Sequence, residues 1–334
     1  MDHVNVIIVG AGLSGVGAAA HLIKKSPNKT FTLLEGRASV GGTWDLFRYP
    51  GIRSDSDMHT LGYNFKPWTE AKAIADGPSI RKYVNETADE YDIRRHIRFD
   101  HKVQSASWDS AAGHWTVTSA LPDGSNTSVT GDFLFMCGGY YSYDEPHRPE
   151  FRGESDYPGQ VGHPQFWHED LDYRGKRVVV IGSGATAMTM VPSMTQNGAK
   201  VTMVQRSPTY VVSRPAEDKI ANLLRRWLPE RWAYAITRLK NTTLSGYFYR
   251  QTRTQPEKTK AQLLQMATAN LGEEMVKAHF TPSYNPWDQR MCLIPNGDLY
   301  QAINDGDATV VTGDIDTWTT TGLRMTDGTE IEAD

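Results

Sequence analysis

The feature that most restricts the fold of this chain is a short plan that occurs twice along it. In the first copy, the apolar run Val4–Val9 leads into the turn Gly10–Gly15 (GAGLSG) and an alanine-rich segment reaching about Lys25. A second apolar run covers Phe31–Leu34. A strand, a glycine-rich turn, a helix and a strand in this order are typical of the β-turn-α-β unit that binds dinucleotides.

The three glycines of the first turn have separate roles in such a unit. Gly10 permits the tight turn, Gly12 lets a pyrophosphate approach the main chain, and Gly15 lets the helix pack on the strand. The helix N-terminus then offers unpaired N–H groups and a partial positive charge to the phosphates. The alternative that these glycines only form a turn stays open.

The second copy begins with the strand Arg177–Ile181 and the turn Gly182–Ala187 (GSGATA). A helical segment to about Gln196 and the apolar run Val201–Val204 follow. Ala187 stands where the first copy has its third glycine, which is a common accommodation. The repeated plan predicts an α/β protein with two Rossmann-like dinucleotide-binding domains.

Opposite charges follow the second strands of the two copies. Glu35 can accept hydrogen bonds from a ribose diol and would repel a 2′-phosphate, so the first site is expected to bind the adenosine of FAD or NAD. Arg206, followed by Ser207, suits a 2′-phosphate through charge-assisted contacts. The contrast favours NADPH at the second site, and an exposed arginine without a ligand is the alternative.

The first copy continues into a small meander of alternating strands. His101–Trp108 and Trp115–Ser119 lead to the apolar run Phe133–Gly139, which we interpret as a return to the parent sheet. The predicted FAD-binding domain covers residues 1–140, and a linker covers 141–176.

The second copy, with residues 177–334, is the predicted NADPH-binding domain. Ala308–Val311, Asp316–Thr320 and Gly322–Met325 are expected to form its meander. The chain stops at Asp334, where the matching return strand is expected, so we interpret the sequence as a fragment that lacks the segment completing the FAD-binding domain.

A helical insertion is predicted at about residues 215–280. Its part Leu223–Leu239 is basic and aromatic, which is typical of a helix lying on a membrane surface. A helical cap packed over the active site is favoured instead, because Pro229 interrupts the stripe. A peripheral membrane contact stays open.

Composition excludes several classes of function. A net charge of −4 argues against nucleic acid as the main partner. Cys137 and Cys292 stand far apart and form no CxxC, so neither a zinc site nor a redox dithiol is supported, and no metal is expected. The chain has no signal-like leader before Val6 and no apolar run of spanning length, so a cytoplasmic location is expected.

Several separate motifs resemble a known family. The stretch Gly41–Trp44 (GGTW), continued by Arg48–Asp55 (RYPGIRSD), resembles Baeyer–Villiger monooxygenases, which are class B flavoprotein monooxygenases. The runs Trp44–Arg48 and Ser54–Met58 look most like the ethionamide-activating branch from mycobacteria and related actinobacteria. The likeness covers essentially the whole chain.

The family fingerprint lies between the two domains, at residues 157–168. Gly159, His163 and Trp167 match it, whereas Tyr157 and His168 depart from it. Without the resemblance, the histidine and the tryptophan read as an ordinary loop residue and a packing residue, and this alternative stays open.

The resemblance implies two sets of cofactor-binding residues. The FAD set is Gly10, Gly12, Ser14, Gly15, Glu35, Gly42, Thr43, Trp44, Asp55 and the backbone near Val103. The NADPH set is Arg53, Ser54, Gly182, Ser183, Gly184, Ala185, Thr186, Arg206 and Ser207. Gln289 stands where family members often carry a basic residue, which weakens the expected preference for NADPH.

The resemblance also implies a mechanism in which a C4a-peroxyflavin transfers one oxygen atom of O2. Arg290 is the implied catalytic arginine, because a guanidinium stays charged at any working pH and stabilises a peroxide anion. Asp55 is expected to hold Arg290 and balance its charge, and a structural ion pair of Arg290 with Asp288 is the alternative. Ketones would give esters or lactones, and sulfur compounds would give S-oxides.

Two rival functions stay open. One is a flavin monooxygenase that oxygenates nitrogen or sulfur with little Baeyer–Villiger activity. The other is a non-catalytic nucleotide-binding fragment. A disulfide reductase is disfavoured by the missing CxxC.

Overall fold

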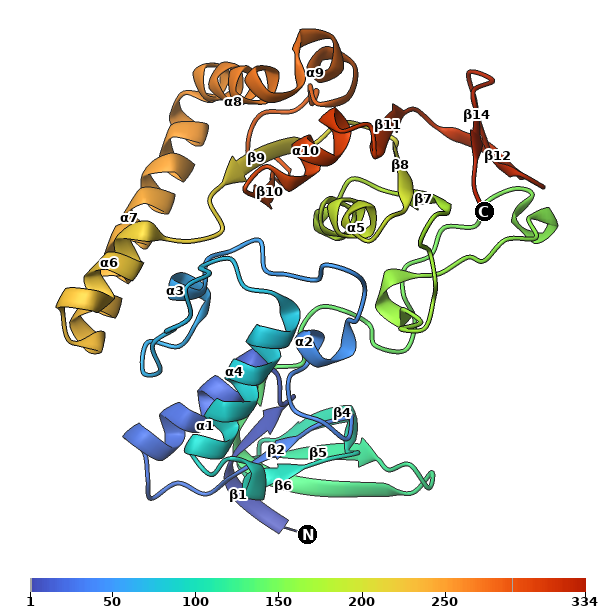
Figure 1. Ribbon diagram of the computed structural model, residues 1–334. Coiled ribbons are helices and arrows are strands. Elements are labelled where there is room, and N and C mark those ends of the chain that lie inside the picture. The colour runs from blue at the N-terminus through green and yellow to red at the C-terminus, as the bar shows by residue number, and fades with distance from the viewer. Residues whose placement is uncertain (1, 290) are drawn as a thin grey trace. The chain divides into compact units, whose positions relative to one another are not determined.

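The computed structural model describes residues 2–289 and 291–334. The chain divides into two compact units, which are described separately (Figure 1). The first unit contains the residues up to Phe47 and Gly77–Pro146. The second unit contains Arg48–Asp76 and His147–Asp334, so the segment after the GGTW turn groups with the second unit.

A six-stranded sheet, in the order β3-β2-β1-β6-β5-β4, forms the centre of the first unit. Helices α1 and α4 contact each other beside this sheet (Figure 1). The elements are β1 (Asp2–Val9), α1 (Leu13–Lys25), β2 (Phe31–Leu34), α2 (Thr43–Leu46), α4 (Gly77–Glu90), β3 (Ile97–Arg98), β4 (Lys102–Asp109), β5 (His114–Ala120) and β6 (Asn126–Met136).

Strand β6 connects the meander of the first unit to its parallel sheet. It pairs antiparallel with β5 and parallel with β1, where Val6 is opposite Phe133. The predicted return strand is therefore confirmed. Ile7, Leu34, Val117 and Val129 form a buried cluster that joins the parallel strands to the meander, and burial of such apolar side chains stabilises this junction.

Among the described residues, three sheets and a helical region make up the second unit. A parallel sheet has the order β11-β8-β7, β9 pairs with β10, and β12, β13 and β14 form an antiparallel meander. The elements are α3 (Met58–Leu61), β7 (Arg177–Ile181), α5 (Ala185–Gln196), β8 (Lys200–Gln205), β9 (Tyr210–Arg214), α6 (Lys219–Trp227), α7 (Glu230–Thr254), α8 (Pro256–Leu271), α9 (Glu273–His279), β10 (Met291–Pro295), α10 (Asp298–Asn304), β11 (Ala308–Thr312), β12 (Ile315–Thr319), β13 (Gly322–Met325) and β14 (Glu330–Glu332).

One strand of the second unit lies elsewhere than the sequence predicts. Ala308–Val311 was expected in the meander, but β11 pairs parallel with β8, with Ala308 opposite Val201. The prediction was wrong because a run of this length fits either pairing. The connection from β8 to β11 contains β9, helices α6 to α10 and β10, so it is long enough for the crossover that a parallel strand requires.

The predicted helical insertion is confirmed as helices α6 to α9, which lie between β9 and β10 in the sequence. These two strands pair parallel, so the helices form the crossover between them. Among the described residues, no helix is both long enough and apolar enough to cross a membrane.

Candidate functional site

The first glycine loop is closed by contacts that exclude side chains. Gly10 has a φ of +99°, which L side chains rarely adopt. A Cβ on Gly15 would lie 1.9 Å from the Gly10 carbonyl oxygen. Helix α1 begins at Leu13 after the N-cap Gly12, and no side chain of the described residues caps it. The N–H group of the exposed Ser14, in the first turn, therefore faces the side from which an anion would approach.

Glu35 ties the end of β2 to this loop. Its side chain is only 6% exposed. Oε2 accepts a hydrogen bond from Ala11 N–H at 2.7 Å, and Oε1 accepts one from Arg37 N–H at 3.0 Å. Burial raises the pKa of Glu35, while the two backbone N–H groups and the Arg37 charge oppose that rise. A carboxylate held in this way keeps free lone pairs for hydroxyl groups.

The GGTW turn packs directly on the first glycine loop. Gly41 N–H donates to Ala11 O at 3.1 Å, and a Cβ on Gly42 would lie 3.1 Å from Gly12 Cα. Gly41 and Gly42 have φ angles of +133° and +57°. Helix α2 begins at Thr43, directly after these two glycines, and Trp44 is half-buried within it.

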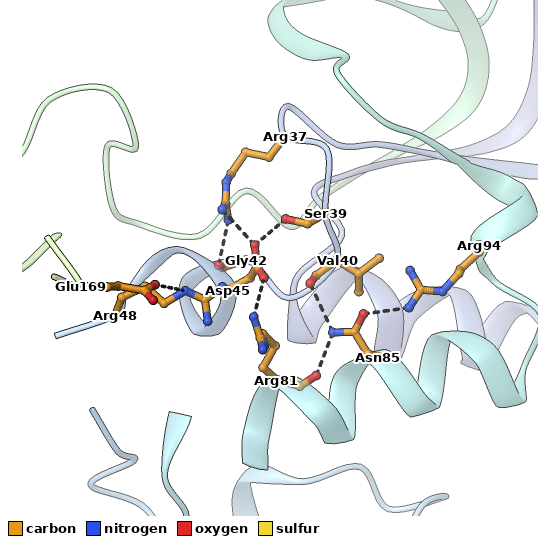
Figure 2. A network of polar contacts seen from close by, with 10 residues as sticks. All are labelled: Arg37, Ser39, Val40, Gly42, Asp45, Arg48, Arg81, Asn85, Arg94 and Glu169. Atoms are coloured by element: carbon orange, nitrogen blue, oxygen red, sulfur yellow. Dashed lines mark hydrogen bonds and ion pairs between the residues drawn. The ribbon is translucent and has the colours of Figure 1, made fainter. Parts of the chain in front are cut away.

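A buried carboxylate that the sequence analysis missed holds this turn (Figure 2). Asp45 accepts hydrogen bonds from Arg37 Nη2, at 2.9 Å, and from the Ser39 hydroxyl. Arg81 of α4 lies 3.5 Å from its other oxygen. Arg37 also donates to Gly42 O at 3.4 Å. No spacing rule signals this cluster, because α4 follows more than thirty residues later in the chain.

The second glycine loop has the same design with more open space. Gly182 has a φ of +126°, and a Cβ there would meet none of the described atoms within 4 Å. Helix α5 begins at Ala185 after the N-cap Gly184, again with no side-chain cap from the described parts of the chain. Thr186, in the first turn of α5, is half-buried.

The end of β8 reaches this second loop. Ser183 Oγ donates to Ser207 O at 3.4 Å. Arg206 is exposed, and its guanidinium forms no ion pair with residues 2–289 or 291–334. The loop, the start of α5 and this cation therefore lie at one end of the parallel sheet.

Arg53 has structural contacts of its own. It forms an ion pair with Asp298, at the start of α10, and its Nη2 donates to Met188 O at 3.2 Å. The hydroxyl of the buried Ser54 donates to Ser56 O at 2.8 Å and accepts from Ser56 N–H. These contacts connect the segment after the GGTW turn with α5 and α10 inside the second unit.

The structure describes only one of the two predicted catalytic residues. Asp55 is exposed in the second unit, and Arg290 lies outside the described residues. Asp288, close to Arg290 in the sequence, forms an ion pair with Arg253 of α7 at 2.7 Å.

Val103, predicted to lie near FAD, belongs to β4 of the first unit. It is half-buried against the cluster around Ile7.

Two fingerprint residues have local contacts. His163 Nδ1 accepts a hydrogen bond from Gln165 N–H at 3.2 Å, and Trp167 packs edge-on against Tyr173. Burial lowers the pKa of His163.

The residues present fit two nucleotides of different charge. Both loops offer a helix N-terminus that no described side chain caps, and a side chain at Gly42 would fill the space beside Gly12. A buried carboxylate stands beside the first loop, and an exposed guanidinium follows the strand beside the second. The first arrangement suits a ribose, and the second suits a ribose that carries a phosphate.

Comparison with known sequences gives consistent matches. The family described as flavin-binding monooxygenase-like matches residues 70–270, and an NAD(P)-binding Rossmann-like domain matches residues 8–76. FAD-containing monooxygenase EthA of Mycobacterium tuberculosis (strain H37Rv) is 53% identical over 335 aligned positions, which cover 100% of this chain and 68% of that protein. Putative FAD-containing monooxygenase MymA of the same strain is 48% identical over 338 residues, with the same coverage.

Solved structures share the fold. An oxidized steroid monooxygenase bound to NADP has a TM-score of 0.79 and 25% identity, over 99% of this chain and 70% of that chain. A cyclohexanone monooxygenase bound to ε-caprolactone has a TM-score of 0.80 over 100% of this chain and 72% of that chain, and its 20% identity makes it a match in fold alone. The predicted fold class, α/β with Rossmann-like domains, is confirmed.

Proposed function

This chain belongs to the flavin-binding monooxygenase-like family, and from that premise we propose that it uses FAD and NADPH to insert one oxygen atom of O2 into ketones. Membership in the family confirms the resemblance and the flavin monooxygenase function predicted from the sequence. The proposal adds the assignment of each nucleotide to a loop, and the ketone as substrate. Oxidation of sulfur compounds is proposed as a second activity of the same site.

We assign FAD to the first glycine loop. The α1 N-terminus would bind its pyrophosphate, and Glu35 would accept hydrogen bonds from the ribose hydroxyls. A side chain at Gly42 would occupy the space beside Gly12, because its Cβ would lie 3.1 Å from Gly12 Cα. FAD-containing relatives that match the whole chain support the assignment.

We assign NADPH to the second glycine loop. The N-terminus of α5 would bind the pyrophosphate, and Arg206 with Ser207 would bind the 2′-phosphate. The single observation that carries the proposal is the exposed guanidinium of Arg206 directly after β8, which has no ion-pair partner among the described residues. It contrasts with the buried carboxylate of Glu35 directly after β2. We propose residues 1–140 and 177–334 as the FAD- and NADPH-binding domains, joined by a linker at 141–176.

FAD, once reduced by NADPH, supplies the oxygen-transfer chemistry. The role we propose for Arg290 is to stabilise negative charge on the reacting oxygen atoms, because its guanidinium remains protonated. Asp55 would balance that charge. Arg290→Ala is expected to leave FAD reduction by NADPH intact and to lower ester formation from a ketone at least about 100-fold.

The experiment that tests the nucleotide assignment is charge reversal at Arg206. Arg206→Glu is expected to weaken NADPH binding about 10- to 100-fold and leave NADH binding nearly unchanged, because only the phosphate contact is lost. Lys176→Glu is the matched control, since this exposed lysine lies at the opposite end of β7. Equal loss in the two variants would contradict the assignment.

The substrate class needs a separate assay. A cyclic ketone and a thioether are supplied in parallel, with NADPH oxidation and product formation measured together. Ester or lactone formation supports the proposal. Sulfoxide formation without any ester would identify the rival nitrogen- or sulfur-oxygenating monooxygenase instead.

A further inference from the structure

Helices α6 and α7 present an apolar face to solvent. On α6, Ile220, Leu223 and Trp227 are exposed, and on α7, Trp232, Ile236 and Leu239 are exposed. We call these six side chains the α6–α7 face. Trp227 is 79% exposed and Trp232 is 66% exposed, which is unusual for side chains of this size.

Helical spacing places these residues on one side of each helix. On α7 they follow one another by four and then three residues, and on α6 by three and then four. The opposite sides of the helices are buried, at Ala221 in α6 and at Ala233 and Thr237 in α7. The two helices contact each other, and only Leu228 and Pro229 separate them in the chain (Figure 1).

The buried side of α7 is held in place inside the second unit. Tyr234 donates from its hydroxyl to Tyr63 O at 3.0 Å, and Arg238 donates to His59 O at 2.8 Å and to Gly62 O at 3.0 Å. Helix α7 therefore covers α3 with one side. These contacts fix the orientation of α7, so its apolar side is exposed in the folded protein without any conformational change.

The charge of this segment identifies a partner. Residues 219–254 contain eight Lys and Arg and one Glu, a net charge of +7, whereas the whole chain carries −4, so the remaining residues carry −11. Lys219, Arg226 and Arg231 are exposed and form no ion pair within the described parts of the chain. Other cations of the segment are neutralised, such as Lys240 by Asp218 and Arg253 by Asp288.

We propose that the α6–α7 face binds in the plane of an anionic lipid surface. Its tryptophans and aliphatic side chains would enter the headgroup region, while Lys219, Arg226 and Arg231 contact the lipid phosphates. Tryptophan prefers this interface because its ring is apolar and its N–H is polar. An amphipathic helix with cations beside its apolar face binds membranes in this way. A symmetric pairing with a second copy would instead place two segments of charge +7 against each other.

The test is flotation of the full protein with lipid vesicles. The protein is expected to float with vesicles of phosphatidylcholine and phosphatidylglycerol in equal parts, and much less with phosphatidylcholine alone. Added salt is expected to weaken the binding, because the Debye length falls to about 3 Å at 1 M. Failure to float with the anionic vesicles would overturn the proposal.

Two double variants locate the binding surface. Trp227→Ser with Trp232→Ser is expected to lower the partition coefficient at least about tenfold, since two interfacial anchors are lost. The control is Trp108→Ser, an exposed tryptophan of the first unit. Arg226→Glu with Arg231→Glu is expected to lower the partition coefficient more than about 25-fold, because each cation near an anionic surface raises this coefficient about fivefold. The control for this variant is Lys25→Glu with Lys29→Glu, which makes the same change in net charge at two exposed lysines of the first unit.

Circular dichroism checks that each variant is folded. Equal flotation of the variants and their controls would overturn the proposal. Concentration-dependent self-association of the protein without lipid, lost in the tryptophan double variant, would also overturn it, because a second copy would then cover the face. The inference does not depend on the proposed oxygenation, and vesicle binding is measured without any substrate.

Discussion

Arg53 donates a hydrogen bond to the main-chain carbonyl of Met188, which an ordinary α-helix would reserve for the N–H of residue 192. Residue 192 is Pro192, inside α5, and it has no N–H to donate. The Arg53 side chain therefore satisfies a carbonyl that the helix cannot. An arginine expected at a nucleotide site thus also supports the helix that begins at the second glycine loop.

A double-mutant cycle tests this relationship. Arg53→Met is expected to lower the free energy of unfolding by about 1–3 kcal/mol, because it leaves the Met188 carbonyl unsatisfied. In the Pro192→Ala background the loss should be smaller by about 1 kcal/mol, since an alanine at this position would supply the missing N–H. Denaturant unfolding measures all four proteins. The cycle of Asp316→Asn with Pro192→Ala is the control and should be additive, because Asp316 pairs with Arg324 in the meander and not with Arg53. A zero coupling between positions 53 and 192 would contradict the explanation.

Gly15 tests how closely the first loop is packed. Gly15→Ala is expected to lower the free energy of unfolding by about 2–3 kcal/mol, because its Cβ would overlap the Gly10 carbonyl oxygen. FAD binding should weaken with it. The matched control is Gly246→Ala in α7, where a Cβ meets none of the described atoms within 4 Å. That change should raise stability by about 0.5–1 kcal/mol through helix propensity. Thermal unfolding compares the two, and an equal effect in both would be inconsistent with the loop geometry.

Replacement of Glu35 by glutamine tests whether its carboxylate charge is needed, because the two side chains have nearly the same shape. An amide has one oxygen, so Glu35→Gln cannot accept from both Ala11 N–H and Arg37 N–H. The expected loss is about 1–3 kcal/mol of stability, with weaker FAD binding measured by flavin fluorescence. NADPH binding, assigned to the other unit, is the internal control and should not change. A variant with unchanged FAD affinity would remove Glu35 from the ribose site.

Asp45 is expected to be a positioning residue for the GGTW turn. Asp45→Asn leaves Arg37 and Arg81 without this carboxylate and should cost about 2–3 kcal/mol of stability. The matched control is Asp89→Asn, which removes an exposed ion pair with Arg94 and should cost about 0–1 kcal/mol. If the turn matters for FAD, the flavin absorption spectrum shifts in the first variant only. Identical spectra and stabilities would exclude this role.

The buried His59 predicts how stability depends on pH. Burial lowers the pKa of His59 below its ordinary value of 6.5, and its Nδ1 has no partner in the described structure. Between pH 6.5 and the lower pKa of the folded state, the unfolded chain binds more protons at this residue than the folded chain does. The free energy of unfolding should therefore fall as the pH is lowered from about 7 to about 5. His59→Phe should flatten that slope and keep the ring near Tyr234. A slope unchanged by this substitution would contradict the assignment.

Local spacing predicted much of the fold, including the two glycine loops and the strands that border them. Gly10, Gly15 and Gly182 follow from the turn that their neighbours require, and the acidic Glu35 follows from its place after a strand. The placement of β11 did not follow, because a short apolar run fits parallel and antiparallel partners equally well. Asp45 was missed because its partner on α4 is remote in sequence.

The amino-acid sequence by itself determined the two β-turn-α-β units, their opposite charges and the family, because each depends on residues close together along the chain. The tertiary structure alone decided that Arg53 satisfies Met188, and that Asp45 binds two arginines. Arg53 and Met188 are separated by 135 positions in the sequence, and Asp45 and Arg81 by 36 positions. No spacing rule reaches so far, since only the packed fold brings such residues together and removes the water that would otherwise satisfy them.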